Sequence, residues 1–183
     1  MNKTDIEIIY IGKRSKILGR IYKSLPKGKI YSLDEAMNKE NQFYNKIVIL
    51  FSLPYKNKEN EYLIFIKNLK CKLFINISSI CALNNNYKNK IGRSYQINKY
   101  KTHLITQHKK NSLNIVCGSF VENQYDICDP LMGVHFATKY GQFIDKLSFL
   151  LNNFKKIQIY KKNIFCFKIY GNYTKIAFLI SSL

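Results

Sequence analysis

The chain has 183 residues, of which 46% are hydrophobic and 14% aromatic, and these values predict one folded domain rather than a disordered chain. Its formal net charge of +19 would suit nucleic acid or an anionic membrane surface. However, nearly all of the cations are lysines spread along the chain among asparagine and isoleucine, with no arginine-rich stripe and no glycine-aromatic RNA motif. We therefore do not expect a nucleic-acid partner.

No apolar run approaches the roughly 18 residues that a membrane span needs. Asp5 and Glu7 interrupt the N-terminal segment, which argues against a signal peptide, so we expect a cytoplasmic protein without a membrane span. The five cysteines form no Cys-x-x-Cys pair and mostly lie in apolar runs, which is typical of core thiols. The three histidines have no spacing typical of a zinc site, so we expect no metal.

Short apolar runs that predict buried strands alternate with segments of helical period. The predicted strands cover residues 6–11, 30–33, 47–51, 73–77 and 113–117. Between them, one helical stripe spans residues 17–25 and ends at Pro26 and Gly28, and another spans residues 62–69. This alternation predicts an α/β fold with a parallel sheet covered on both faces.

After Pro130 the pattern changes. Apolar residues at helical spacing predict an amphipathic helix over 140–154, and the runs 157–160 and 164–170 resemble a β-hairpin. Residues 174–180 fit a last strand or helix. We therefore expect a single domain over 1–183, with a core at 1–130 and a short helix and hairpin extension at 131–183.

The strongest chemical signal is Ser79, at the end of an apolar run, followed by Tyr95 and Lys99 four residues apart. On a helix beginning near Ser94, this spacing stacks the phenol on the ammonium. A nearby cation favours the phenolate, so Tyr95 could exchange a proton with a substrate oxygen, while Ser79 hydrogen-bonds the same oxygen. The helix has two opposite stripes, one of Ile97, Tyr100, Leu104 and His108 and one of Tyr95, Lys99, Thr102 and Thr106.

The first predicted strand runs into a turn with Gly12, Ser15 and Gly19, where backbone amides could approach a pyrophosphate at the start of a helix. The glycine spacing is imperfect, and an ordinary strand-to-helix turn is an equal alternative. Asp34 follows the second strand, where a carboxylate can bind the adenine ribose of NAD. Lys13 and Arg14 could instead attract the 2′-phosphate of NADP, so NAD is preferred and NADP kept open.

Together these residues resemble the short-chain dehydrogenase/reductase superfamily, in particular its extended, NAD-dependent epimerase/dehydratase branch, over about residues 5–122. The resemblance implies that Ser79, Tyr95 and Lys99 are catalytic, that Lys99 also holds the nicotinamide ribose and that Ser52 lies beside the cofactor. The elements that carry it are Gly12, Ser15 and Gly19, Asp34, the strand 47–52, the strand end 77–79, the Tyr95-x-x-x-Lys99 pair and the segment 115–121.

The resemblance implies an NAD(P)-dependent oxidoreductase or epimerase acting on a nucleotide-activated sugar, or a related secondary alcohol or ketone, in polysaccharide biosynthesis. Its partners would be a dinucleotide cofactor, a small-molecule substrate and, as in many relatives, a second copy of the chain. The resemblance also implies a Rossmann-like doubly wound sheet, with residues 1–130 as the dinucleotide-binding core and residues 131–183 as a reduced extension on the substrate side. That extension is much shorter than the substrate-binding part of the extended enzymes. The alternative is a catalytically silent Rossmann-like binding or regulatory subunit.

Overall fold

The computed structural model describes residues 6–54, 57–83, 93–122, 135–153, 163–166 and 168–170. Its centre is a six-stranded sheet with the order β2-β1-β3-β4-β5-β8, in which every neighbouring pair is parallel. The strands are β1 (Ile8–Ile11), β2 (Lys29–Tyr31), β3 (Ile47–Leu50), β4 (Leu73–Ser79), β5 (Ser112–Cys117) and β8 (Asn163–Cys166). The predicted Rossmann-like parallel sheet is confirmed.

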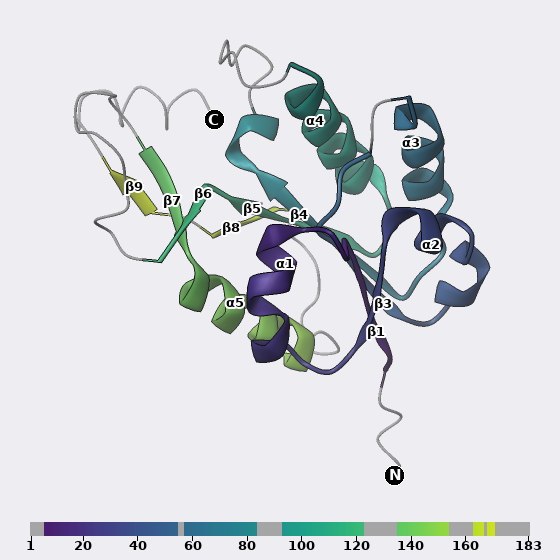
Figure 1. Ribbon diagram of the computed structural model, residues 1–183, viewed down its shortest axis with the longest axis horizontal. Coiled ribbons are helices and arrows are strands. Elements are labelled where there is room, and N and C mark those ends of the chain that lie inside the picture. Colours follow the sequence, from purple (N-terminus) through teal and green to yellow (C-terminus); the bar gives the residue numbers. More distant parts are fainter. Residues whose placement is uncertain are drawn as a thin grey trace.

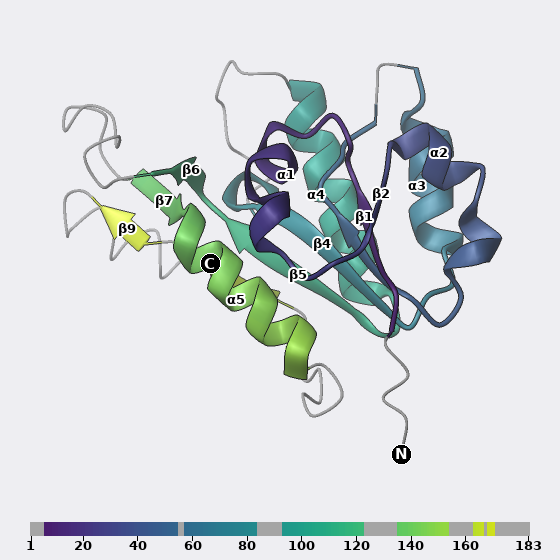
Figure 2. The same ribbon diagram turned by 60° about the horizontal axis from the view of Figure 1, so that its bottom comes forward.

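Helices cover both faces of this sheet (Figures 1 and 2). One face carries α1 (Lys16–Ile21) and α5 (Tyr140–Asn153). The other carries α2 (Leu33–Met37), α3 (Glu59–Asn68) and α4 (Arg93–His108). Short 3₁₀ turns lie at η1 (Tyr22–Ser24), η2 (Glu40–Phe43) and η3 (Ile80–Ala82). Strand β1 pairs with β2 on one side and with β3 on the other, so the sheet extends from β1 in both directions.

Strands β1 and β3 are apolar along their whole length because both of their faces are buried. In β1, Ile8 and Tyr10 pack under α1 and α5, whereas Ile9 and Ile11 pack under α2 and α3. Successive side chains of a strand point to opposite faces, so a continuous apolar run supplies both layers of the core. This is why β1 and β3 could be recognised from the sequence.

The face of α4 that packs on the sheet is polar. Lys99, Thr102, His103 and Thr106 are all buried, while Ile97 is 38% exposed. Two hydroxyls of this face donate to carbonyls one turn earlier in the helix, Thr102 to Asn98 at 2.7 Å and Thr106 to Thr102 at 2.8 Å. These bonds satisfy polar groups that would otherwise be costly to bury. The sequence showed two stripes on this helix, and from Lys99 onward the polar one faces the core.

A second, three-stranded sheet contains β6 (Ser119–Val121), β7 (His135–Lys139) and β9 (Lys168–Tyr170), in the order β6-β7-β9. The predicted run 164–170 is divided between the two sheets, because β8 pairs with β5 in the main sheet and β9 pairs with β7 in the small one. Its proposed hairpin partner at 157–160, and the segment 174–180, lie outside the described residues.

The two sheets meet at Thr138 of β7. Its hydroxyl donates to the carbonyl oxygen of Cys166 on β8 and accepts a hydrogen bond of 2.9 Å from the amide of Gly118, directly after β5. On the same side of the molecule, Phe120 of β6 packs edge-on against Phe143 of α5. Among the described residues, no helix is long and apolar enough to cross a bilayer.

Candidate active site

The sequence-predicted residues gather, with one exception, at the carboxyl edge of the main sheet. Gly12 directly follows β1, Ser52 lies two residues after β3 and Ser79 is the last residue of β4. Helix α4 leads from β4 to the parallel strand β5, so it begins at the same edge, and Tyr95 is its third residue. This is the edge at which open parallel sheets bind their ligands. The exception is Gly19, which lies inside α1, one turn from the helix start.

Gly12 has a conformation and a position that only glycine accepts. Its φ angle is +135°, and a Cβ atom on it would lie 2.9 Å from the Cβ of Phe51 and 3.3 Å from the amide nitrogen of Ser52. The turn after β1 therefore packs directly on the chain that leaves β3, at the point where the strand order reverses. By contrast, a Cβ on Gly19 would meet nothing within 4 Å, so α1 does not require a glycine there.

The glycine turn is closed by its own hydrogen bonds. The amides of Gly12 and Lys13 both donate to the carbonyl oxygen of Tyr31 on β2, at 2.9 and 3.1 Å. The amide of Ser15 donates to Gly12 at 2.7 Å, and the Ser15 hydroxyl accepts from the amide of Leu18, which caps α1. These amides therefore already have protein acceptors, which distinguishes this turn from one whose amides all face a ligand.

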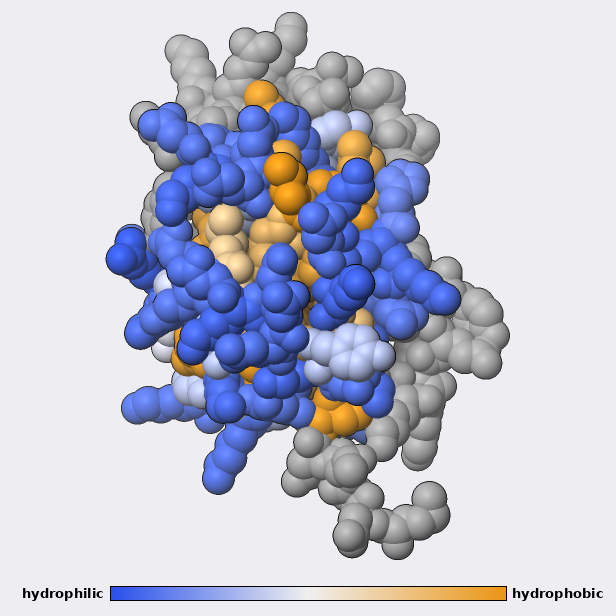
Figure 3. All heavy atoms as spheres, turned by 90° about the vertical axis from the view of Figure 1, so that its right-hand side faces the viewer, coloured by the Kyte–Doolittle hydropathy of each residue, from blue (hydrophilic) through white to orange (hydrophobic). Residues whose placement is uncertain are grey.

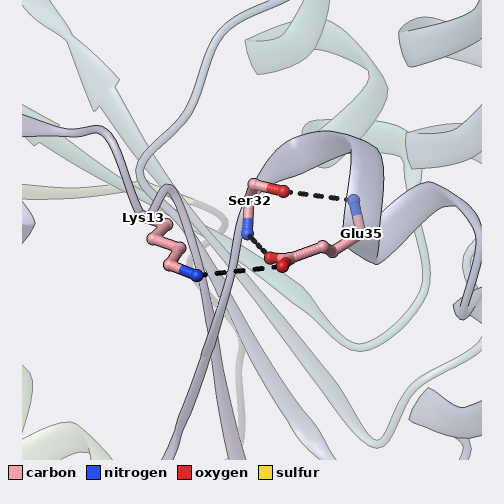
Figure 4. Close-up of polar contacts among 3 residues, drawn as sticks. All are labelled: Lys13, Ser32 and Glu35. Carbon is pink, nitrogen blue, oxygen red and sulfur yellow. Dashed lines mark hydrogen bonds and ion pairs between the residues drawn. The ribbon is translucent and has the colours of Figure 1, made fainter.

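The carboxylate of Glu35, next to the predicted Asp34, contacts the glycine turn. Ser32 and Glu35 form a capping box at the start of α2, in which the Glu35 carboxylate accepts from the Ser32 amide at 2.6 Å. The same carboxylate lies 3.8 Å from the ammonium of Lys13 (Figure 4). The hydrogen bonds from Ser32 and the charge of Lys13 lower the pKa of Glu35. Asp34 instead pairs with Lys58 at 3.0 Å.

Lys99 connects α4 to the end of β4. Its side chain is buried, and its ammonium donates a hydrogen bond of 2.7 Å to the carbonyl oxygen of Ile77, two residues before Ser79. A buried cation is costly unless polar groups surround it, and this carbonyl supplies one such group. The bond holds a positive charge at the carboxyl end of β4, one helical turn after Tyr95.

The other two candidates lie closer to solvent. Tyr95 is 45% exposed, and Ser79 is half-buried at the end of β4. Ser52, on the neighbouring strand end, is also half-buried, and its hydroxyl donates to the carbonyl oxygen of Leu53 at 3.3 Å. A phenol at the surface, a hydroxyl at a strand end and a buried ammonium thus occur on adjoining elements of one edge. This combination can exchange a proton with a bound hydroxyl or carbonyl.

A polar seam between α4 and the sheet was not anticipated from the sequence. Asn76 on β4 donates to Asn114 on β5 at 2.8 Å, and Asn114 donates to Asn163 on β8 at 3.2 Å, because the three residues share one register. Beside them, Ser78 shares a hydrogen bond of 2.8 Å with Nδ1 of His103. Burial lowers the pKa of His103 to about 4, so the imidazole is neutral near pH 7. The seam positions α4, and with it Lys99.

Two thiols lie next to Ser79 in register. Ser79 pairs with Cys117 of β5, and Cys117 pairs with Cys166 of β8. The two cysteines are buried, in agreement with their expected role as core thiols. A hydrogen bond with Cys166 and burial together raise the pKa of Cys117, although the charge of Lys99 acts in the opposite direction. Cys117 is therefore a neutral thiol beside the candidate site.

Solved structures with a similar fold include several enzymes that are named for nucleotide-activated sugars. A GDP-L-fucose synthetase from Naegleria fowleri bound to NADP aligns with all of this chain and 84% of its own, with a TM-score of 0.58 and 11% identity. A UDP-N-acetylglucosamine 4-epimerase from Bacillus cereus aligns with 92% of this chain and 78% of its own, with a TM-score of 0.55 and 10% identity.

A third similar structure is a GDP-D-glycero-L-gluco-heptose synthase from Campylobacter jejuni in the presence of NADPH, covering 97% of this chain and 85% of its own, with a TM-score of 0.56 and 8% identity. No family model matches the sequence, and no curated protein matches it. At this level of identity the similarity establishes the fold.

Proposed function

We propose that this protein is an NAD(P)-dependent enzyme of the short-chain dehydrogenase type, an epimerase, dehydratase or reductase, whose substrate is a nucleotide-activated sugar or a related secondary alcohol or ketone. The proposal rests mainly on the bond between Lys99 and Ile77, which keeps an ammonium at the strand end that carries Ser79. Tyr95 lies one turn away on the same helix. The fold shared with nucleotide-sugar enzymes supports the choice of substrate class.

In this proposal Tyr95 is the acid/base. Its partial exposure gives a bound substrate access to the phenol, which donates or accepts the proton as the substrate oxygen changes between hydroxyl and carbonyl. The ammonium of Lys99 stabilises the phenolate form through its charge, and the Ser79 hydroxyl orients the same substrate oxygen. The two hydroxyl groups and the cation thus have separate roles on one reacting centre.

A nicotinamide dinucleotide would accept a hydride from the substrate or donate one to it. Lys99 would hold the nicotinamide ribose, and Ser52 would lie beside it, because both belong to the same sheet edge as Ser79. The exposed side chains of Lys13 and Arg14 give the glycine turn a positive charge suited to a diphosphate. Gly12, Ser15 and Gly19 stay candidates for the turn itself, and Asp34 for the adenine ribose.

The decisive experiment replaces Tyr95 with phenylalanine. The variant should bind cofactor as the wild type does but convert sugar nucleotides at least about 100-fold more slowly, since general acid–base catalysis contributes about that much. The assay separates products after incubation with a panel of UDP- and GDP-sugars and NAD or NADP. Tyr100→Phe, on the other stripe of the same helix, is the matched control and should keep full activity.

A second candidate is a catalytically silent Rossmann-like subunit that binds a partner or regulates it. One observation favours it, namely that the amides of Gly12 and Lys13 both donate to Tyr31 instead of facing a ligand site. This candidate predicts that wild type and Tyr95→Phe behave identically in every assay, with no product from any sugar nucleotide. Product formation by the wild type alone would exclude it.

A further inference from the structure

A groove opens between the C-terminal ends of α3 and α4, on the edge of the sheet opposite the candidate active site. Its volume is about 660 Å³, within the range typical of small-molecule sites. Its lining comes mainly from the segments that follow the two helices, around Leu69 before β4 and around Lys109 before β5, with Tyr44 at the side. The groove is thus separate from the residues proposed for catalysis.

The walls of the groove are held together by hydrogen bonds between the helices. The ammonium of Lys109, after α4, donates to the carbonyl oxygen of Lys67 near the end of α3 at 3.2 Å. Deeper in the interface, the Thr102 hydroxyl of α4 and the phenol of Tyr62 on α3 share a hydrogen bond of 3.1 Å. These contacts fix the distance between the two helices, so the groove is preformed and a ligand need not order it.

The groove combines an apolar floor with a cationic rim. Leu69, Leu104 and Ile105 form apolar lining, and burial raises the pKa of the adjoining Cys71 to about 11, which keeps its thiol neutral. Around them the lining residues include Lys67, Lys70, Lys109 and Lys110 together with His108. Figure 3 shows the side of the molecule that carries α3, with apolar surface between polar and charged side chains.

No carboxylate is among the described residues that line the groove. Lys67, Lys70 and Lys110 are exposed, and none of them forms an ion pair with a described residue. Several cations around one small cavity repel each other, and an anion placed between them relieves that repulsion. The apolar floor would at the same time bury a non-polar body.

We propose that this groove binds a small organic anion, one with a phosphate, sulfonate or carboxylate head group on an apolar body. The head group faces Lys67, Lys70 and Lys110, and the body lies on Leu104 and its apolar neighbours. A second copy of the chain fits less well, because a symmetric pair would bring two lysine rims together. The inference is independent of the proposed activity.

The test uses two fluorescent probes of similar shape, the anionic 1-anilinonaphthalene-8-sulfonate and the neutral N-phenyl-1-naphthylamine. The wild type should bind one molecule of the anion, more weakly as salt increases, and bind the neutral probe much less. The double variant Lys67→Gln/Lys70→Gln should weaken the anion by about tenfold, as expected for the loss of two nearby charges. Leu104→Gln, which changes only the floor, should weaken both probes.

A charge-matched control removes two exposed lysines elsewhere, Lys23→Gln/Lys27→Gln, and should leave the affinity unchanged. The proposal is overturned if the two double variants bind the anion equally, or if the neutral probe binds as tightly as the anion. Self-association that strengthens when Lys67 and Lys70 are replaced would also overturn it, in favour of a second copy in the groove.

Discussion

The ammonium of Lys99 on α4 lies 2.7 Å from the carbonyl oxygen of Ile77 on β4, to which it donates a hydrogen bond. A lysine this deeply buried stays charged only where polar groups compensate for the loss of water. The contact therefore fixes both the position of α4 and the location of a positive charge. Both matter for the proposed proton transfer at Tyr95.

Replacing Lys99 with methionine tests this contact. The variant keeps the length of the side chain but leaves the Ile77 carbonyl without this donor, so the free energy of unfolding should fall by about 1–3 kcal/mol. Urea denaturation measures the change. Lys101→Met, at an exposed position on the same helix, should leave stability unchanged. A Lys99→Met variant as stable as the wild type would show that the hydrogen bond has no structural role.

The two glycines near α1 should respond oppositely to alanine. Gly12→Ala forces a Cβ to within 2.9 Å of Phe51 at a φ of +135°, so unfolding should require about 1–3 kcal/mol less. Gly19→Ala adds a better helix former in open space and should stabilise the protein by up to about 1 kcal/mol. Paired thermal and urea unfolding measures both, and a stabilised Gly12→Ala variant would contradict the turn geometry.

Stability should decrease on mild acidification because of His103. In the unfolded chain the imidazole takes up a proton below its usual pKa of 6.5. In the folded protein burial lowers the pKa of His103 to about 4. The unfolded state therefore binds more protons between these values, and the stabilisation present above pH 6.5 is lost toward pH 4, by at most about 1.4 kcal/mol per pH unit.

Urea unfolding between pH 7.5 and 5 compares His103→Gln with His108→Gln, which alters an exposed histidine of the same helix. Only the first replacement should flatten the pH dependence. If the two variants follow the same curve as the wild type, His103 does not contribute to it.

The asparagine seam gives a further prediction. Asn114→Leu removes the acceptor of Asn76 and the donor to both Asn163 and the carbonyl oxygen of His103, leaving buried polar groups unpaired. We expect a loss of about 3 kcal/mol in the free energy of unfolding. Asn68→Leu at the exposed end of α3 is the control and should have little effect.

The sequence predicted most of the sheet because runs such as the one that forms β3 are buried on both faces and are therefore apolar. It could not assign β8 to this sheet, since a pairing between residues near 115 and 164 depends on long-range contacts that local pattern does not contain. The orientation of α4 was also undetermined. Its polar face is buried because the asparagines of β4 and β5 offer it partners, and only the fold reveals that complementarity.

At the site, the order of Ser79, Tyr95 and Lys99 along the chain predicted residues that do reach one edge of the sheet. The role of Glu35 was missed, although Ser32 and Glu35 have the spacing of a capping box and could have been recognised. The contact of Glu35 with Lys13 depends on β1 and β2 being neighbours, so no local pattern indicates it. A binding measurement tests whether these residues hold a cofactor.

Calorimetric titration of the folded protein with NAD and with NADP tests the central claim most directly. We predict saturable binding of one molecule of at least one of them, with a dissociation constant below about 1 mM, the upper end of typical enzyme affinities. Lys99→Met should weaken this binding, while Lys101→Met should not. No binding of either dinucleotide to the folded wild type at millimolar concentration would contradict the proposal that the carboxyl edge of this sheet is a nicotinamide-dependent active site.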